Sequence, residues 1–257
     1  MLFDTHAHLN LPHFEKNLEK IIEEAKKNQV NYILVPGINY QTSVKALEIS
    51  KKFENIYSAC GFHPSEIEDF DLERIKNLLK EEKVLAIGEI GIDKLKADNL
   101  EKQKFVFEEQ VKLALEFNKP IIIHNRKGTD EILEILSKYQ NKIKEKVIFH
   151  CTEPEEKILN FAIEYRCFLG FDGDLTYLEE KQNFVKKVPL NLILLETDSP
   201  FLVPEPLKSQ KIFPNKPSNL PLILNFLSQL LKIENKTLEK IIFENSLRAF
   251  KILKNGN

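Results

Sequence analysis

Glycine is scarce in this chain of 257 residues, where it occurs 8 times, against about 18 expected from average usage of about 7%. Histidine occurs only 6 times, and the formal charge is −2. The chain therefore lacks the basic excess that is typical of histone-like or homeodomain-like DNA-binding proteins. An enzyme that contacts a few phosphates locally remains compatible with this charge. Hydrophobic residues make up 42% of the chain, which excludes a disordered tail or a collagen-like repeat.

Cysteine is also scarce, and Cys60, Cys151 and Cys167 show no CxxC spacing. An odd number without close pairing argues against a disulfide framework and favours a reduced protein whose cysteines pack in the core. The chain shows no signal-peptide pattern, and its longest apolar tract, residues 220–231, is interrupted by polar residues. We therefore expect a cytoplasmic protein without a membrane segment, and no motif indicates an obligate protein partner.

Short apolar runs recur through the sequence, at residues 2–4, 32–35, 56–60, 84–87, 121–123, 147–149, 167–169 and 192–195. Runs this short and continuously apolar are typical of strands that are buried on both faces of a parallel sheet. Segments with helical periodicity separate them. Eight strands that alternate with helices in about 250 residues predict a (β/α)8 TIM barrel, forming a single domain over residues 1–257. A doubly wound sheet is the alternative, but the glycine-rich turn of its nucleotide-binding form is missing.

The scarce histidines fall at the ends of the predicted strands. Five of the six follow a strand, namely His6, His8, His63, His124 and His150. Three acids follow strands in the same way, namely Glu89, Asp93 and Asp198. The carboxyl ends of all barrel strands open on one face, where barrel active sites lie, so these side chains should meet. Imidazole and carboxylate together suit divalent ions such as Zn²⁺ or Mn²⁺, and we therefore predict a metal site.

The number of candidate ligands bears on the number of ions. His6 and His8 are two residues apart, so on a strand both side chains point to the same side and can chelate. Four histidines and two carboxylates exceed the needs of one four-coordinate ion with an open position, and they suffice for two bridged ions. Each residue alone also has a structural interpretation: His124 fits a hydrogen-bonded core histidine, and Glu89 or Asp198 fits a helix cap.

Several motifs resemble those of the TatD-type metal-dependent deoxyribonucleases. They lie at residues 3–9 (FDTHAHL), 61–64 (GFHP), 88–93 (GEIGID), 120–126 (PIIIHNR) and 195–202 (LETDSPFL), followed by Asn215 and Pro217. The similarity runs from Phe3 to about Phe250. It implies an amidohydrolase-like barrel, an enzyme that hydrolyses ester bonds, and two divalent ions (Mg²⁺, Mn²⁺ or Zn²⁺). The activity it implies is 3′→5′ exonuclease action on DNA, especially on single strands.

The resemblance also implies roles for individual residues. The ligands are His6, His8, Glu89 and Asp198 for one ion, and Glu89, His124 and His150 for the other, with Glu89 as the bridge. The ions would lower the pKa of a shared water and yield a hydroxide that attacks phosphorus. Asp198 would accept the proton, and His63 would contact the scissile phosphate or the leaving oxygen. Asp4 either orients a metal-bound histidine or forms a simple strand-end hydrogen bond.

Three kinds of side chain are candidates for binding the DNA substrate. The polar candidates are His63, Arg126 and Asn215. The lysine candidates, which fit a solvated surface equally well, are Lys127, Lys208, Lys211 and Lys216. The aromatic candidates, which fit base stacking or core packing, are Phe62, Phe201 and Phe213. The last two belong to a proline-rich stretch, residues 200–219, which we expect to form a long ordered loop. His13 has no such neighbours and is expected at the surface.

Three positions depart from the family pattern and bear on substrate preference: the segment Thr152-Glu153-Pro154 after His150, Lys94 in place of an aromatic residue, and Lys216 in place of an acid. None of them removes a predicted ligand. Two other functions stay open. One is hydrolysis of an ester or amide, such as the aminoacyl ester of D-aminoacyl-tRNA, an activity also attributed to this family. The other is a non-catalytic binding barrel, which the complete ligand set disfavours.

Overall fold

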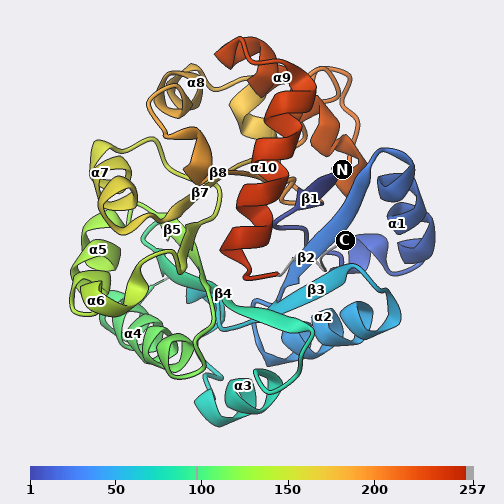
Figure 1. The fold of residues 1–257 in the computed structure, drawn as a ribbon. Coiled ribbons are helices and arrows are strands. Elements are labelled where there is room, and N and C mark those ends of the chain that lie inside the picture. The colour runs from blue at the N-terminus through green and yellow to red at the C-terminus, as the bar shows by residue number, and fades with distance from the viewer. Residues whose placement is uncertain (97, 253–257) are drawn as a thin grey trace.

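Eight parallel strands follow one another around a nearly closed barrel in a computed structural model that describes residues 1–96 and 98–252. Each strand pairs in parallel with the next along the chain. The strands are β1 (Leu2–Asp4), β2 (Val30–Pro36), β3 (Ile56–Cys60), β4 (Val84–Asp93), β5 (Ile121–Arg126), β6 (Val147–Phe149), β7 (Phe168–Phe171) and β8 (Ile193–Leu195). The predicted (β/α)8 barrel is therefore confirmed (Figure 1). That residues 1–257 form a single domain stays a prediction.

Helices surround the strands (Figure 1). They are α1 (Leu18–Lys27), α2 (Tyr40–Lys52), α3 (Leu72–Leu78), α4 (Leu100–Glu116), α5 (Thr129–Ser137), α6 (Gln140–Ile143), α7 (Glu156–Tyr165), α8 (Glu179–Val185), α9 (Leu220–Leu231) and α10 (Asn235–Ala249). Helix α10 lies across the end of the barrel where the strands begin. The amide of Asn245 on this helix donates to the carbonyls of Leu190 and Ile193, at 2.7 and 2.9 Å, where β8 starts.

Apolar side chains fill both sides of the sheet. Inside the barrel, every strand contributes one residue to a cluster that α10 closes, namely Phe3, Leu34, Ala59, Ala86, Ile122, Ile148, Phe168 and Leu194. A larger cluster packs between the sheet and the helices. Burial on both faces explains why the strands are continuously apolar runs. Each fully buried large side chain contributes roughly 1.5–3 kcal/mol to the stability of the fold. The packed interior therefore holds the carboxyl ends of the strands in fixed positions.

The barrel closes between β8 and β1 through residues that lie beyond both strands. The N–H of His8 donates to the carbonyl of Ser199 at 2.7 Å, and the N–H of Asp198 donates to the carbonyl of His6 at 2.9 Å. Ala7 and Ser199 form an isolated parallel bridge at the same place. Backbone hydrogen bonds therefore join the two segments that carry these predicted ligands.

Strands β2, β4, β5 and β7 are longer than the sequence predicts, and the extensions of β4 and β5 carry residues of the site. Strand β4 continues to Asp93 and β5 continues to Arg126, so Glu89 and His124 lie on strands rather than after them. The polar residues interrupt the apolar run, so the sequence predicts that the strand ends there. In the structure their side chains face the interior of the barrel mouth, and the backbone pairing between β4 and β5 continues past them. Gly91 permits this pairing, because a Cβ at that position would lie 1.9 Å from the carbonyl oxygen of His124.

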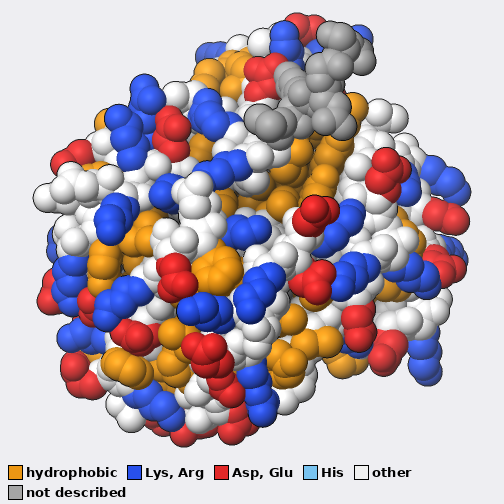
Figure 2. All heavy atoms as spheres, turned by 60° about the horizontal axis from the view of Figure 1, so that its bottom comes forward, with side chains coloured by type: hydrophobic (Ala, Val, Ile, Leu, Met, Phe, Trp, Pro, Cys, Tyr) orange, Lys and Arg blue, Asp and Glu red, His pale blue; other side chains and the backbone are white. Residues whose placement is uncertain are grey.

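The proline-rich stretch after β8 forms a long loop, as predicted, that reaches α9 through a short 3-10 turn at Pro217–Asn219. Among the described residues, no helix combines the length and apolar character needed to cross a membrane. On the face that Figure 2 shows, Lys and Arg side chains are interspersed with Asp and Glu. This face carries no broad basic patch, in keeping with the net charge of −2.

Candidate metal centre

Four of the predicted ligands converge at the carboxyl ends of the strands. The Nε2 atoms of His6 and His8 lie 3.2 Å apart, and Oε2 of Glu89 lies 3.4 and 3.6 Å from them. Oδ1 of Asp198 lies 3.4 Å from Nε2 of His8. In a tetrahedral site with bonds of about 2.1 Å, the donor atoms are about 3.4 Å apart. The spacing of these atoms therefore fits one divalent ion.

The second carboxylate oxygen of Glu89 faces the remaining histidines. Its Oε1 lies 2.7 Å from Nδ1 of His124, 3.8 Å from Nε2 of His63 and 3.9 Å from Nε2 of His150. The carboxylate thus lies between two groups of imidazoles, with one oxygen toward each group. A carboxylate in this position can contact two cations at once.

The candidate ligands are buried, except for the partly buried His124, and their carboxylates dominate the electrostatics. Burial opposes ionisation of Glu89, but the surrounding histidines outweigh it and hold the pKa of Glu89 well below its usual value. The same balance lowers the pKa of Asp198. Burial would lower the pKa of His150, yet Glu196 and Asp198 raise this pKa to about 10. Such a concentration of negative charge is the environment that a divalent cation would neutralise.

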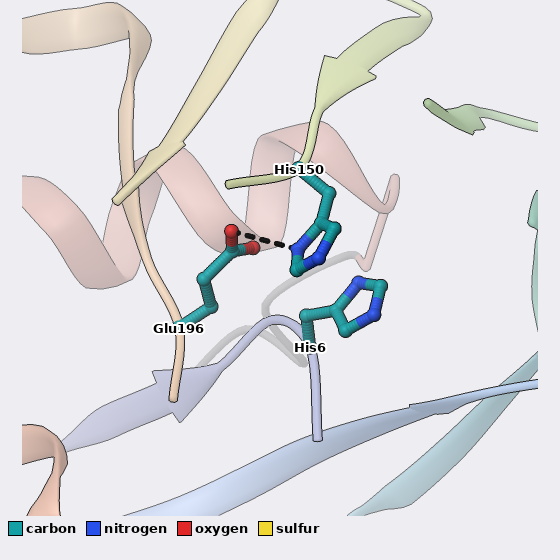
Figure 3. Close-up of side chains that lie close together, drawn as sticks. All are labelled: His6, His150 and Glu196. Carbon is teal, nitrogen blue, oxygen red and sulfur yellow. Dashed lines mark hydrogen bonds and ion pairs between the residues drawn. The ribbon is translucent and has the colours of Figure 1, made fainter. Parts of the chain in front are cut away.

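Two further carboxylates fix the orientation of the imidazoles. Oε1 of Glu196 accepts a hydrogen bond from Nδ1 of His150 at 2.9 Å (Figure 3). The same oxygen accepts the N–H of Cys151 at 2.7 Å. Oδ2 of Asp93 lies 3.2 Å from Nε2 of His124. Each contact leaves the other ring nitrogen facing Glu89, as the carboxylate partners of metal-bound histidines do.

Asp4 does not orient a histidine ring. Its Oδ1 accepts the N–H of Thr197 at 2.9 Å, and its Oδ2 accepts the Thr197 hydroxyl at 2.6 Å. Of the two interpretations of Asp4, the strand-end hydrogen bond is therefore correct. Glu196 instead is the carboxylate that orients a histidine, namely His150. The ring of His150 also stacks face to face on the ring of His6, with centroids 3.5 Å apart (Figure 3). A sequence signal existed, because Glu196 lies two residues before Asp198.

A cavity of about 500 Å³ opens over these side chains. Besides candidate ligands, its lining includes His63, Ser65, Lys96, Arg126 and Phe201. Burial lowers the pKa of His63 to about 3, so this imidazole is neutral at pH 7. Its Nδ1 accepts the N–H of Ser65 at 3.1 Å, which puts the ring proton on Nε2.

Comparison with known proteins identifies the family of this chain. The profile of the family described as TatD related DNase matches residues 3–251. This chain belongs to that family. It is 37% identical over 259 residues to the Bacillus subtilis protein named uncharacterized metal-dependent hydrolase YabD, covering 98% of this chain and 100% of that protein. The crystal structure of the TatD homolog YjjV from Escherichia coli matches with a TM-score of 0.90 and 25% identity over 98% of both chains.

The predicted resemblance is confirmed, and the chain is a TatD-type metal-dependent hydrolase with buried His, Glu and Asp groups that could bind metal. A further relative, a metal-dependent hydrolase of Methanocaldococcus jannaschii, is 32% identical over 252 residues and covers 96% of each chain.

Two predicted substrate contacts lie away from the cavity. Asn215 is 0% exposed, and its amide donates to the carbonyls of Thr197 and Leu202 at 2.8 and 3.2 Å. Phe62 is 2% exposed and packs against Phe70. The structure therefore does not bring Asn215 or Phe62 to the cavity: the first fixes the loop after β8, and the second packs in the core.

The residues at the three departures from the family pattern are also absent from the cavity lining. The ammonium of Lys94 lies 2.8 Å from Glu131, and that of Lys216 lies 3.1 Å from Glu24. Glu153 is nearly buried and accepts a backbone N–H of the neighbouring loop. The charged groups of Lys94, Lys216 and Glu153 thus interact with partners outside the cavity lining.

The cations that do line the cavity are Arg126 and Lys96. Arg126 is a predicted contact, whereas Lys96 was missed, since it lies in an irregular turn that carries no motif. Lys208, one of the lysine candidates, places its ammonium 4.1 Å from the ring centre of Tyr177 instead.

A second group of potential ligands lies beside the site, formed by Cys151, Asp172 and Asp174. The ammonium of Lys181 lies 2.6 Å from Oδ2 of Asp174 and 3.3 Å from Sγ of Cys151. Burial would lower the pKa of Lys181, but these neighbours outweigh it and raise the pKa. An internal cation therefore already balances this group, which we interpret as a buried ion-pair network.

Proposed function

We propose that this TatD-type hydrolase is a deoxyribonuclease that removes nucleotides from the 3′ end of single-stranded DNA. The observation that carries the proposal is the position of Glu89, whose two oxygens face separate groups of histidines beneath an open cavity. A pair of cations held by one carboxylate suits displacement at phosphorus. The family description as TatD related DNase supports DNA as the substrate.

We assign the two ions to the residues that surround Glu89. The proposed ligands are His6, His8, Glu89 and Asp198 for one ion, and Glu89, His124 and His150 for the other. Bound there, Mn²⁺, Zn²⁺ or Mg²⁺ would supply hydroxide at neutral pH and offset the charge that develops on the phosphate. The mixture of nitrogen and oxygen donors favours Zn²⁺ or Mn²⁺ over Mg²⁺.

Asp198 is the group placed to accept a proton. Its pKa is held low by the neighbouring histidines, so the carboxylate is ionised, and it borders the cavity. Its backbone is in the left-handed region, with φ of 50°, a conformation that is unusual for aspartate and recurs at functional sites. The hydrogen bond from its N–H to His6 holds this conformation.

His63 and Arg126 are the groups placed to bind the phosphate. The proton on Nε2 of neutral His63 can donate to a phosphate oxygen or to the leaving oxygen, while Ser65 fixes the ring from the other side. The Arg126 guanidinium borders the same cavity and provides a permanent positive charge. These two side chains bind and orient the substrate without contributing to the metal site.

The test is cleavage of end-labelled single-stranded DNA by the purified protein loaded with Mn²⁺, Zn²⁺ or Mg²⁺. A 3′ label should be released as a mononucleotide, and a 5′ label should remain on progressively shorter strands. His124→Ala and Asp198→Asn should lower the rate at least about 100-fold, whereas Lys157→Ala, on an exposed ion pair, should not. If the DNA stays intact while D-aminoacyl-tRNA is deacylated, the nuclease proposal is wrong and ester hydrolysis replaces it.

A further inference from the structure

Three aromatic rings continue outward from the candidate metal centre to the rim of the barrel. The ring of Phe201 lies edge-on to that of His8, with centroids 6.2 Å apart. The ring of His13 lies 6.4 Å from Phe201 and 5.7 Å from Phe213, again edge-on. Phe201 is 44% exposed and Phe213 is 61% exposed, and Phe201 also lines the cavity. The apolar surface is thus continuous from the cavity to the solvent.

The backbone holds these rings in place although they are exposed. His13 lies in a 3-10 turn, Pro12–Phe14, whose last residue is 1% exposed and anchors it in the core. The N–H of Phe201 donates to the carbonyl of Asp198 at 2.8 Å. The buried amide of Asn215 holds the loop that carries Phe201 and Phe213, because it donates to the carbonyls of Thr197 and Leu202. A surface fixed in this way loses little conformational entropy when a ligand binds.

Single exposed apolar residues are common and need no explanation. A row of three rings that leads from a cavity, with His13 in contact with both Phe201 and Phe213, is different, because such a patch marks a binding surface. Flat rings at right angles to one another present faces on which other flat rings stack. Lys211, which is exposed two residues before Phe213, adds a positive charge to the same loop. This combination of rings and a cation is typical of surfaces that bind unpaired nucleic acid strands.

We infer that His13, Phe201 and Phe213 form a platform on which unpaired bases next to the scissile phosphodiester stack. The inference rests on the proposed nuclease function. Bases in a duplex are stacked on each other and paired, so the platform selects single strands. Stacking on an aromatic side chain is tolerant of sequence, and we therefore expect little discrimination between the four bases.

The test compares Phe213→Ala with a matched control, Phe105→Ala. Phe105 is 59% exposed on α4, away from the cavity. Binding is measured by fluorescence anisotropy in an Asp198→Asn background, with labelled oligothymidylate and with an oligomer of equal length whose sites are abasic. Phe213→Ala should weaken binding to oligothymidylate about 5- to 150-fold and leave binding to the abasic oligomer unchanged. Phe213→Trp should restore affinity, and Phe105→Ala should have no effect.

Three results would overturn the platform. The first is that the protein binds oligothymidylate and the abasic oligomer with equal affinity. The second is that Phe213→Ala and Phe105→Ala bind DNA equally well. The third is that Phe213→Ala keeps its DNA affinity but changes its oligomeric state, which would assign the rings to a contact with a second copy of the chain. Cleavage by the protein without substitutions is measured separately. DNA cleavage that is insensitive to Phe213→Ala refutes the platform alone, whereas absence of cleavage refutes the nuclease function and leaves the binding comparison to decide on the platform.

Discussion

Removing the charge of Glu196 should weaken metal binding at His150. Both hydrogen bonds from His150 and Cys151 reach the same oxygen, Oε1, while Oε2 lies 3.4 Å from the hydroxyl of Thr5. In Glu196→Gln, the amide oxygen can keep both bonds and the amide nitrogen can donate to Thr5. This variant therefore isolates the charge, whereas Glu196→Ala removes the charge and both bonds.

The expected magnitude follows from these contacts. Loss of the partner that orients a metal-bound histidine reduces metal affinity about 10- to 100-fold, or about 1.4–2.7 kcal/mol. We expect Glu196→Gln at the lower end, because the ring orientation survives. Glu196→Ala belongs at the upper end, and it should also lower the free energy of unfolding by about 1–3 kcal/mol, because the buried N–H of Cys151 loses its acceptor.

Competition of the protein with a zinc-binding dye measures these affinities directly. Glu131→Gln is the matched control, since Glu131 also accepts a hydrogen bond, from Lys94, but lies outside the cavity lining. The control should bind both ions as tightly as the parent protein. If Glu196→Ala binds the same number of ions with unchanged affinity, Glu196 does not support His150, and the proposed ligand set is wrong.

Three further predictions concern the surroundings of the site. Gly170→Ala should reduce metal affinity in the same dye assay, because its Cβ would lie 2.5 Å from Oε1 of Glu196; unchanged affinity would contradict this. Lys181→Met should lower the free energy of unfolding, measured with urea, by about 3–5 kcal/mol, because Asp172 and Asp174 lose their buried counterion. A smaller loss would show that the two carboxylates become protonated instead. Removing the ions with EDTA should lower the Tm, because an ion at 100 times its Kd stabilises the fold by about 2.7 kcal/mol.

The sequence predicts the barrel well because buried parallel strands are continuously apolar. Strands β1, β3 and β6 begin and end at the predicted residues. The carboxyl halves of β4 and β5 escaped prediction for a physical reason. Their polar side chains are buried by the site rather than by the core, so Glu89 and His124 look like loop residues in a reading based on hydrophobicity.

The sequence predicts which histidines meet at the site, because the topology of a parallel barrel alone determines this. Parallel strands put their carboxyl ends on one face, so the five histidines at four strand ends had to approach one another. The partners of the histidines were not predictable in this way. Asp4 and Glu196 both lie within two residues of a candidate ligand, and only the fold shows that Asp4 contacts Thr197 while Glu196 contacts His150.

The charges that border the cavity favour a phosphodiester over a neutral ester. The carboxylates of the site and of its orienting partners are Glu89, Asp93, Glu196 and Asp198, with a combined charge of −4. Two divalent ions would balance this charge. Arg126 and Lys96, which line the same cavity, then add two positive charges to its lining. An anionic phosphate is attracted by these charges, whereas a neutral ester is not. Arg126→Gln should therefore lower kcat/KM for DNA more than for a neutral ester; an equal loss for both substrates would remove the electrostatic argument for the nuclease.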